Sequence, residues 1–296
     1  MLTTATQRLA RRTTRTRGRG LHAVALDRLV ATRDPVLTID LLKGSWRAEE
    51  TPLVSGSRRV AIVRPHEHGI LLGDPQLHRY SRIAITEHAS GEVARAALSA
   101  LDDGASQRAG LTRLWATPSA AFAGLSSVTG AGAQTPEDEP PFALPSDRAV
   151  IESPYIAEAA EHSASCVAAW NVLESDPQRH MVAFNLIRIP DPAAYKEFSS
   201  HFAGLPERYG MRFMSVAALD PDPAVSCLVG NAEAAEAASF DLMALVYFPS
   251  TDAFVQAWSD PDIQRAFPLR GPMREKGFRH LWLRCERETG RSGAET

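Results

Sequence analysis

The segment His180–Pro192, "HMVAFNLIRIPDP", carries the clearest structural signals in the chain. Met181–Ile189 is a nearly unbroken apolar run that ends at a proline, which is typical of a buried strand. Asp191-Pro192 then predicts the start of a helix, because proline is favoured at the first helical position. A similar segment, His22–Pro35 "HAVALDRLVATRDP", lies near the N-terminus. Two such segments in one chain predict an internal repeat.

The residues after Pro192 predict the rest of the second half. Aromatic side chains recur at helical spacing until Gly204, where this helix should end. Ser250 is placed to cap a second helical region that continues to Phe267. Further apolar runs predict the main strands Met211–Ala218, Asp241–Phe248 and Arg279–Cys285, and a short apolar piece, Ser226–Val229, lies between the first two of them. The resulting order is β-α-β-β-α-β, the ferredoxin-like arrangement.

The first half can be aligned with the second in the same order. We predict a strand at His22–Leu29 and a helix over Val36–Glu49, although "VLTIDLL" within that range could by itself be a strand. The other matching segments are Ser57–Arg64, Gly69–Asp74, Ser81–Ser90 and Thr112–Pro118, the last of which places Trp115 over Trp282. Six segments in register argue for a duplication.

These matches divide the chain into five parts. Residues 1–20 carry six arginines and no acid, and we expect a disordered basic tail there; an arm that contacts RNA or a membrane is the alternative. The parts that follow are a degenerate first repeat at 21–118, a linker with a connecting helix at 119–177, a second repeat at 178–286 and a tail at 287–296.

Composition excludes several classes of protein. The chain has 296 residues, a formal net charge of -3 and three cysteines without metal-ligand spacing. We therefore expect a soluble cytoplasmic protein with reduced thiols and no nucleic-acid partner. No apolar run reaches the ~18 residues that a membrane span needs. Sequence motifs of nucleotide-binding proteins and of common hydrolases are also absent.

A β-α-β-β-α-β unit has both helices on one face of its sheet, so the other face must be covered. Two such sheets that face each other would bury both faces. We therefore predict an α+β fold in which two ferredoxin-like repeats form an intramolecular, pseudo-dimeric α/β barrel. Whether the protein also forms a homodimer stays open.

Phe240–Arg270, "FDLMALVYFPSTDAFVQAWSDPDIQRAFPLR", resembles the C-terminal half of small dimeric α/β-barrel proteins, and Phe184–Phe198 resembles their N-terminal half. The resemblance covers residues 180–286 well and residues 20–118 in outline. It implies a small-molecule pocket between sheet and helices. The superfamily includes cofactor-free monooxygenases, lactone isomerases, polyketide cyclases and heme enzymes, so the fold does not determine the chemistry.

Four residues are candidates for catalysis. Asn185 is a polar residue on an apolar strand, and Asp27 is its counterpart in the first half, where it is either a base or simply exposed. His280 could act as a base, and Tyr247 could hold a carbonyl or phenolate. Each also has a structural interpretation, such as a core amide or an exposed side chain.

Four further residues are candidates for substrate binding: Tyr209, Trp258, Arg270 and Trp282. Trp258 could instead only pack its helix on the sheet, and Arg270 could either bind an anion or hold the last loop in place. If the protein binds heme, His201 or His180 is the expected iron ligand. No other metal site is predicted, because "HEH" at His66–His68 lacks a third ligand.

We therefore predict a small-molecule enzyme, of bacterial specialised metabolism, that acts on a hydrophobic or aromatic substrate. Cofactor-free oxygenation, cyclisation or isomerisation would suit these residues. The first alternative is a heme-dependent enzyme with a histidine ligand. The second is a non-catalytic ligand-binding or assembly protein.

Overall fold

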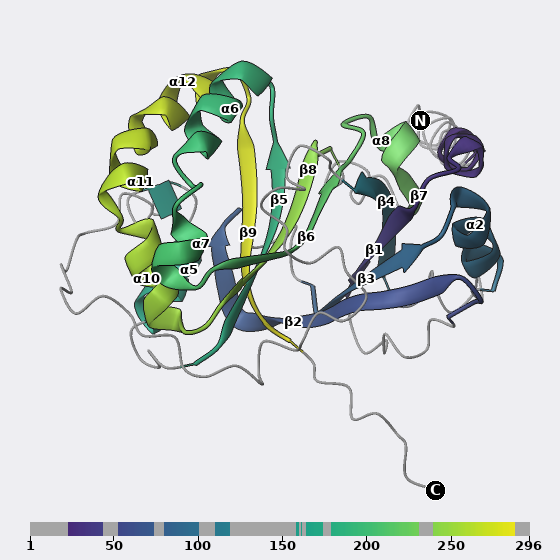
Figure 1. Ribbon diagram of the computed structural model, residues 1–296, viewed down its shortest axis with the longest axis horizontal. Coiled ribbons are helices and arrows are strands. Elements are labelled where there is room, and N and C mark those ends of the chain that lie inside the picture. Colours follow the sequence, from purple (N-terminus) through teal and green to yellow (C-terminus); the bar gives the residue numbers. More distant parts are fainter. Residues whose placement is uncertain are drawn as a thin grey trace, which may run out of the picture. The chain divides into compact units, whose positions relative to one another are not determined.

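The computed structural model shows a mixed α+β fold with antiparallel strand pairing (Figure 1). The residues that it describes are 23–43, 53–73, 80–100, 110–118, 158–159, 161, 164–173, 179–230 and 239–287. The predicted tail at 1–20, residues 288–296 of the predicted tail at 287–296, and most of the predicted linker lie outside these ranges. No described helix is long and apolar enough to cross a membrane.

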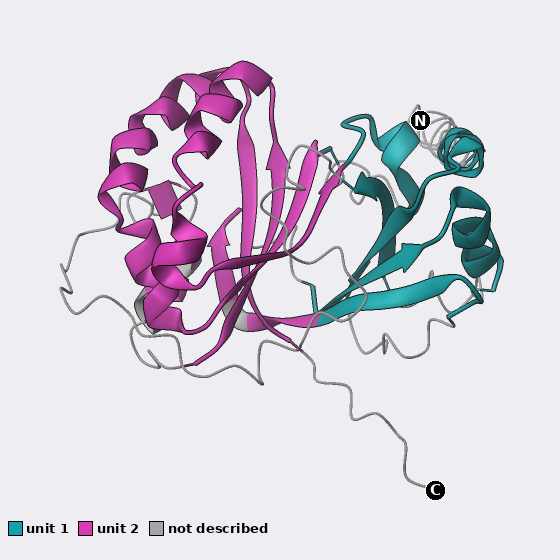
Figure 2. Ribbon diagram, viewed as in Figure 1, with its two compact units in different colours: residues 1–62, 80–118, 219–239 teal, residues 63–79, 119–218, 240–296 magenta. Residues whose placement is uncertain are grey.

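The chain divides into two compact units, and each unit contains a segment from the other half of the sequence (Figure 2). Unit 1 consists of residues 1–62, 80–118 and 219–239, and unit 2 consists of residues 63–79, 119–218 and 240–296. The two halves of the sequence therefore do not fold as two separate contiguous units.

Unit 2 contains a sheet with the strand order β6-β8-β5-β9-β2. The strands are β5 (Met181–Arg188), β6 (Arg212–Ala218), β8 (Leu242–Phe248), β9 (Arg279–Arg287) and the second part of β2 (Ser57–Leu72). The helices are α5 (Ala164–Leu173), α6 (Pro192–Ser200), α7 (Leu205–Tyr209), α10 (Thr251–Trp258), α11 (Pro261–Ala266), the 3-10 helix η4 (Phe267–Leu269) and α12 (Arg270–Glu275). The main strands and helices predicted for the second half in this unit are confirmed.

The helix starts in unit 2 follow the capping signals of the sequence. Asp191 accepts a hydrogen bond from the backbone N–H of Ala194, and Pro192 stands in the first turn of α6. Ser250 caps α10 in the same way by accepting from the N–H of Ala253 at 3.0 Å. These local bonds satisfy N–H groups that have no partner inside their own helix.

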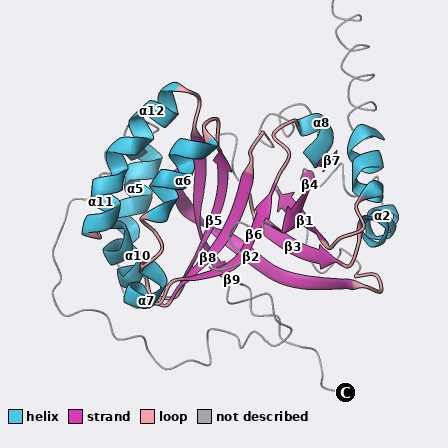
Figure 3. Ribbon diagram, turned by 45° about the horizontal axis from the view of Figure 1, so that its top comes forward, coloured by secondary structure: helices cyan, strands magenta, loops and turns pink. Residues whose placement is uncertain are grey.

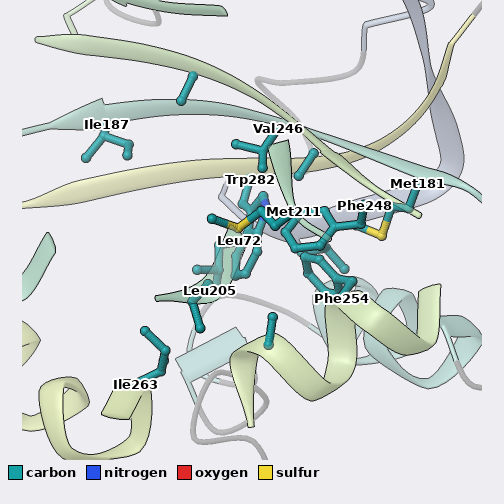
Figure 4. Packing of buried hydrophobic residues seen from close by; sticks show 14 of the residues in the cluster. Leu72, Met181, Ile187, Leu205, Met211, Val246, Phe248, Phe254, Ile263 and Trp282 are labelled. Carbon is teal, nitrogen blue, oxygen red and sulfur yellow. The ribbon is translucent and has the colours of Figure 1, made fainter. Parts of the chain in front are cut away.

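The core of unit 2 lies between one face of the sheet and the helices (Figures 3 and 4). Alternate residues of β5 and β8 point to this face, as the period of a strand requires. Phe254 on α10 and Trp282 on β9 meet in its centre, with ring centroids 5.1 Å apart. Both side chains are completely buried.

Unit 1 has the sheet order β7-β4-β1-β3-β2. Its elements are β1 (Val36–Leu42), the first part of β2, β3 (Arg82–His88), α2 (Gly91–Ser99), β4 (Leu111–Pro118), α8 (Pro223–Ser226) and β7 (Cys227–Val229). A helix over residues 23–31 precedes β1.

Two predictions for the start of the first half are wrong. Residues 23–29 of the predicted strand His22–Leu29 belong to a helix over residues 23–31, because Ala25 and Leu29 are four residues apart and bury one helical face. The predicted helix over Val36–Glu49 contains β1 instead, since all seven residues of "VLTIDLL" are buried, as in a central strand. His22 itself and residues 44–49 lie outside the described residues.

This correction changes which residues correspond between the two halves. Asp40 of β1 pairs with Ala84 and Arg113, while Asn185 of β5 pairs with Ala244 and Trp282. Asp40 therefore lies in the middle of β1, between β3 and β4, and Asn185 lies in the middle of β5, between β8 and β9. Asp40, and not Asp27, is the counterpart of Asn185.

Two more predictions concern β2 and sheet closure. Ser57–Arg64 and Gly69–Asp74 are separate segments in the sequence match, but β2 runs from one into the other as a single strand, with register shifts between Pro65 and Leu72 in its pairing with β9. The closed intramolecular barrel is not confirmed. Cys166, Cys227 and Cys285 are all buried and free.

Candidate functional site

A pocket opens within unit 2, between the helical face of the sheet and the helices that cover it. Its empty volume is about 650 Å³, including the space at its mouth. Most of the lining is apolar or aromatic: Ile187, Tyr195, Phe198, Phe202, Met211, Phe213, Val216, Leu242, Ala244, Val246, Trp258 and Phe278. Asn185, His280 and Arg270 are the other three lining residues. Such a wall with a few polar groups suits a small, largely apolar ligand.

Asn185 is held in one orientation by the sheet. Its Nδ2 donates to the carbonyl oxygens of Ala183 at 3.2 Å and Ala244 at 3.3 Å. Its Oδ1 lies 2.9 Å from Nε2 of His280. Because both carbonyls can only accept, the amide nitrogen must face them and the amide oxygen must face His280. Asn185 is thus hydrogen-bonded to the backbone, like a core amide, and also lines the pocket.

This arrangement selects a tautomer of His280. Nε2 must donate its proton to Oδ1 of Asn185, so in the neutral ring Nδ1 is the nitrogen with the lone pair. The ring stacks on Trp282, with centroids 5.3 Å apart and an interplanar angle of 11°. His280 is therefore oriented on both its edge and its face, and it is one of the residues that line the pocket.

Arg270 forms a buried ion pair at the pocket wall. Its Nε and Nη2 donate to the two carboxylate oxygens of Glu158 at 2.9 and 2.7 Å, and both side chains are at most 4% exposed. The guanidinium lies 5.0 Å from the ring centroid of Phe278. Arg270 therefore links α12 to the segment that carries Glu158.

Trp258 and Trp282, the two tryptophans predicted to bind substrate, lie next to each other at the pocket. Trp258 is part of the lining, and Trp282 is completely buried, with its ring 4.7 Å from that of Trp258. Figure 4 shows Trp282 among the buried side chains of the cluster. The tryptophan pair thus gives this part of the pocket a rigid aromatic floor.

Tyr247 and Tyr209 do not line the pocket. Tyr247 lies on β8 one residue away from the pocket-lining Val246, and its hydroxyl bonds Nδ1 of His180 at 2.7 Å. Tyr209 donates to Oδ2 of Asp260 at 2.8 Å. Burial, together with this carboxylate, raises the pKa of Tyr209 to about 12.

The other residues considered as site residues or metal ligands also lie outside the pocket lining. Asp27 is exposed on the helix over residues 23–31 in unit 1, which agrees with the alternative given for it. His180 is exposed, and His201 is the C-cap residue of α6. His66 pairs with Glu286 at 2.6 Å. Among the described residues, no group of three or more His, Cys, Asp or Glu side chains could hold a metal ion.

Sequence reasoning missed a buried polar cluster in unit 1. Nε and Nη2 of Arg113 donate to Asp40 at 2.5 and 2.7 Å, and both side chains are at most 2% exposed. His88 lies between Thr38 and Ser57, with ring nitrogens 3.0 and 2.8 Å from their hydroxyl oxygens. The signal for this cluster in the sequence is the acid inside "VLTIDLL". It indicates a buried polar residue only if that stretch is a strand, and the helix predicted there hides it.

His88 is strongly biased toward its neutral form. Burial lowers its pKa from 6.5 to about 4, because the imidazolium loses its hydration, and the nearby cation of Arg113 lowers it further. Asp40 acts in the opposite direction. The cluster therefore holds one neutral histidine beside one compensated ion pair.

Comparison with known proteins gives no family for this chain. No family model matches it, and no curated protein is similar enough to be called a relative. A crystal structure of the methylated RPA0582 protein aligns with 42% of this chain and 93% of its own, at 17% identity and a TM-score of 0.32. A similarity this low carries no argument about fold or function.

Proposed function

We propose that the pocket of unit 2 binds a hydrophobic or aromatic small molecule and that His280 accepts a proton from it. The reaction would be an isomerisation, a cyclisation or a cofactor-free oxygenation, each of which can begin with removal of a proton from carbon or from a phenol. The observation that carries the proposal is the His280–Asn185 pair in the wall of an otherwise apolar pocket.

The proposed chemistry needs a base whose lone pair is available to the substrate. Nδ1 of His280 takes the proton, and the ring becomes an imidazolium whose Nε2–H still donates to Asn185 Oδ1. Asn185 thus acts as a positioning residue, because its carbonyl oxygen fixes the tautomer before the transfer and stabilises the cation after it. The apolar walls keep water away from the developing charge.

The sheet order supports a second part of the proposal, that residues 178–286 are a ferredoxin-like repeat. Strands β6, β8, β5 and β9 are neighbours in that order, and helices follow β5 and β8 in the chain. The resemblance to dimeric α/β-barrel proteins implies a ligand site between such a sheet and its helices, which is where this pocket lies.

The residues that line the pocket bear differently on the binding-protein alternative and on the heme alternative. A non-catalytic binding protein would use the same pocket, so only turnover separates it from the enzyme. The heme alternative loses support from the side chains present, because neither His180 nor His201 lines the pocket.

Deuterium exchange into a bicyclic ketone tests the proposal. 2-Tetralone, incubated with the protein in D₂O, should lose its α protons faster than in buffer. His280→Gln should slow the catalysed exchange by about 100-fold or more, the usual contribution of a general base. His201→Gln is the matched control and should exchange at the wild-type rate. Exchange at the background rate with wild-type protein would contradict the proposal.

A further inference from the structure

Arg270 belongs to the pocket wall, yet its cation is bound to a carboxylate of the same chain. The guanidinium donates through Nε and Nη2 to both oxygens of Glu158, in the two-pronged geometry by which proteins bind carboxylate ligands. Arg270 is 2% exposed and Glu158 is 4% exposed. Glu158 is not part of the pocket lining, so Arg270 stands between the cavity and this internal carboxylate.

We propose that Glu158 occupies a carboxylate-binding site of the pocket. The ligand would then be an apolar aromatic carboxylate whose anionic group competes with Glu158 for Arg270. This inference rests on the proposed function, because it names the class of molecule that the same pocket binds.

The surroundings of Arg270 hold its guanidinium in place while its carboxylate partner changes. The rings of Phe278, Phe198 and Phe267 lie 5.0, 5.6 and 5.8 Å from the guanidinium carbon. Such cation–π contacts favour a fixed guanidinium. Phe198 and Phe278 also line the cavity. An aromatic ring packed against these two side chains would therefore have its carboxylate within reach of Arg270.

A second ion pair between the segment of Glu158 and α12 is exposed to solvent. Glu161, three residues later, pairs with Arg274, one turn beyond Arg270. These two side chains are 59% and 38% exposed, so water screens their attraction. Of these two ion pairs, the buried one is the less screened by water. Glu158 and Glu161 together are called the acidic clamp below. A carboxylate that replaces Glu158 would release the clamp.

Calorimetry with two matched ligands tests the inference. The probes are 2-naphthoate and its neutral isostere 2-naphthamide, each titrated into wild-type protein, Glu158→Gln and Glu161→Gln. Glu158→Gln removes the internal competitor and should shift the preference toward naphthoate by about tenfold or more, which is the effect of one charge-assisted contact. Glu161→Gln removes only the exposed pair and should leave the preference unchanged.

The outcomes separate this inference from the proposed function. If naphthamide binds but Glu158→Gln does not change the preference, Glu158 does not occupy a ligand site, and the pocket assignment stands. If no variant binds either probe, both proposals fall.

A measurement on the wild-type protein covers the case in which Glu158→Gln does not fold. Naphthoate should increase hydrogen exchange in peptides that contain the acidic clamp, and naphthamide should not. Equal exchange with both probes would overturn the inference.

Discussion

Replacing Asp40 with leucine should destabilise unit 1 severely. The change leaves the Arg113 guanidinium, which is 2% exposed, without its counter-charge and without both of its hydrogen-bond acceptors. Removal of one partner of such a buried pair costs about 3–5 kcal/mol of unfolding free energy. That is a large part of the ~5–15 kcal/mol that holds a domain folded.

Replacing both partners should restore most of this loss. Asp40→Leu combined with Arg113→Met removes two charges together, and apolar substitutes for a buried pair are commonly neutral or stabilising. The exposed pair of Arg58 and Glu87 is the matched control, with side chains 57% and 38% exposed. Glu87→Leu should cost less than about 1 kcal/mol.

Urea denaturation followed by circular dichroism measures all four proteins. We expect a low midpoint for Asp40→Leu, a midpoint near wild type for the double variant, and little change for Glu87→Leu. A loss below about 1 kcal/mol in Asp40→Leu would refute the reasoning, because it would mean that the Arg113 charge finds water or another partner at no cost.

Three other predictions concern single side chains. The folded pKa of His88, about 4, lies below its ordinary 6.5, so the unfolded state binds the proton first as the pH falls. Stability should therefore decrease from pH 6.5 to pH 4, and urea melts of His88→Gln should show a smaller decrease. Ser250→Ala removes the cap of α10 and should cost about 1 kcal/mol in the same assay, whereas loss of the exposed Ser199 hydroxyl should cost less. Asn185→Leu should lower the rate of 2-tetralone exchange and change its pH profile, because His280 loses the acceptor that fixes its tautomer; an unchanged profile would mean that the amide has no positioning role.

The second half could be predicted well because its signals are local. Pro190 and Asp191-Pro192 separate a strand from a helix within three residues, and Ser250 marks the start of α10. Period-two alternation also predicts which side chains of β5 and β9 share a face, and Asn185 and His280 both belong to the face of the sheet that lines the pocket.

The first half was predicted less well because short apolar runs fit both a helix and a strand. "VLTIDLL" has no alternation, since every side chain of β1 is buried, and periodicity cannot then distinguish the two structures. His22–Leu29 and His180–Ile187 are similar in sequence, but the first belongs to a helix and the second to a strand. Their alignment makes Asp27 the counterpart of Asn185 and overlooks Asp40.

Contacts over long sequence separations could not be predicted at all. The sequence leaves two roles open for Arg270, and neither identifies its partner Glu158, which lies far earlier in the chain. The hydroxyl of Tyr247 likewise bonds Nδ1 of His180, a contact that the sequence does not predict. Such pairings depend on how the strands and helices pack, which no local pattern records.

The protonation of His280 tests the central claim most directly. In a spectrum of protein with ¹⁵N-labelled histidine, assigned with His280→Gln, Nε2 of this residue should carry the proton and Nδ1 should show the shift of an unprotonated nitrogen. Adding 2-naphthol, which places a phenol in the pocket, should move the Nδ1 resonance. A proton on Nδ1, or an Nδ1 resonance that does not respond to the ligand, would contradict the account of this pocket and its base.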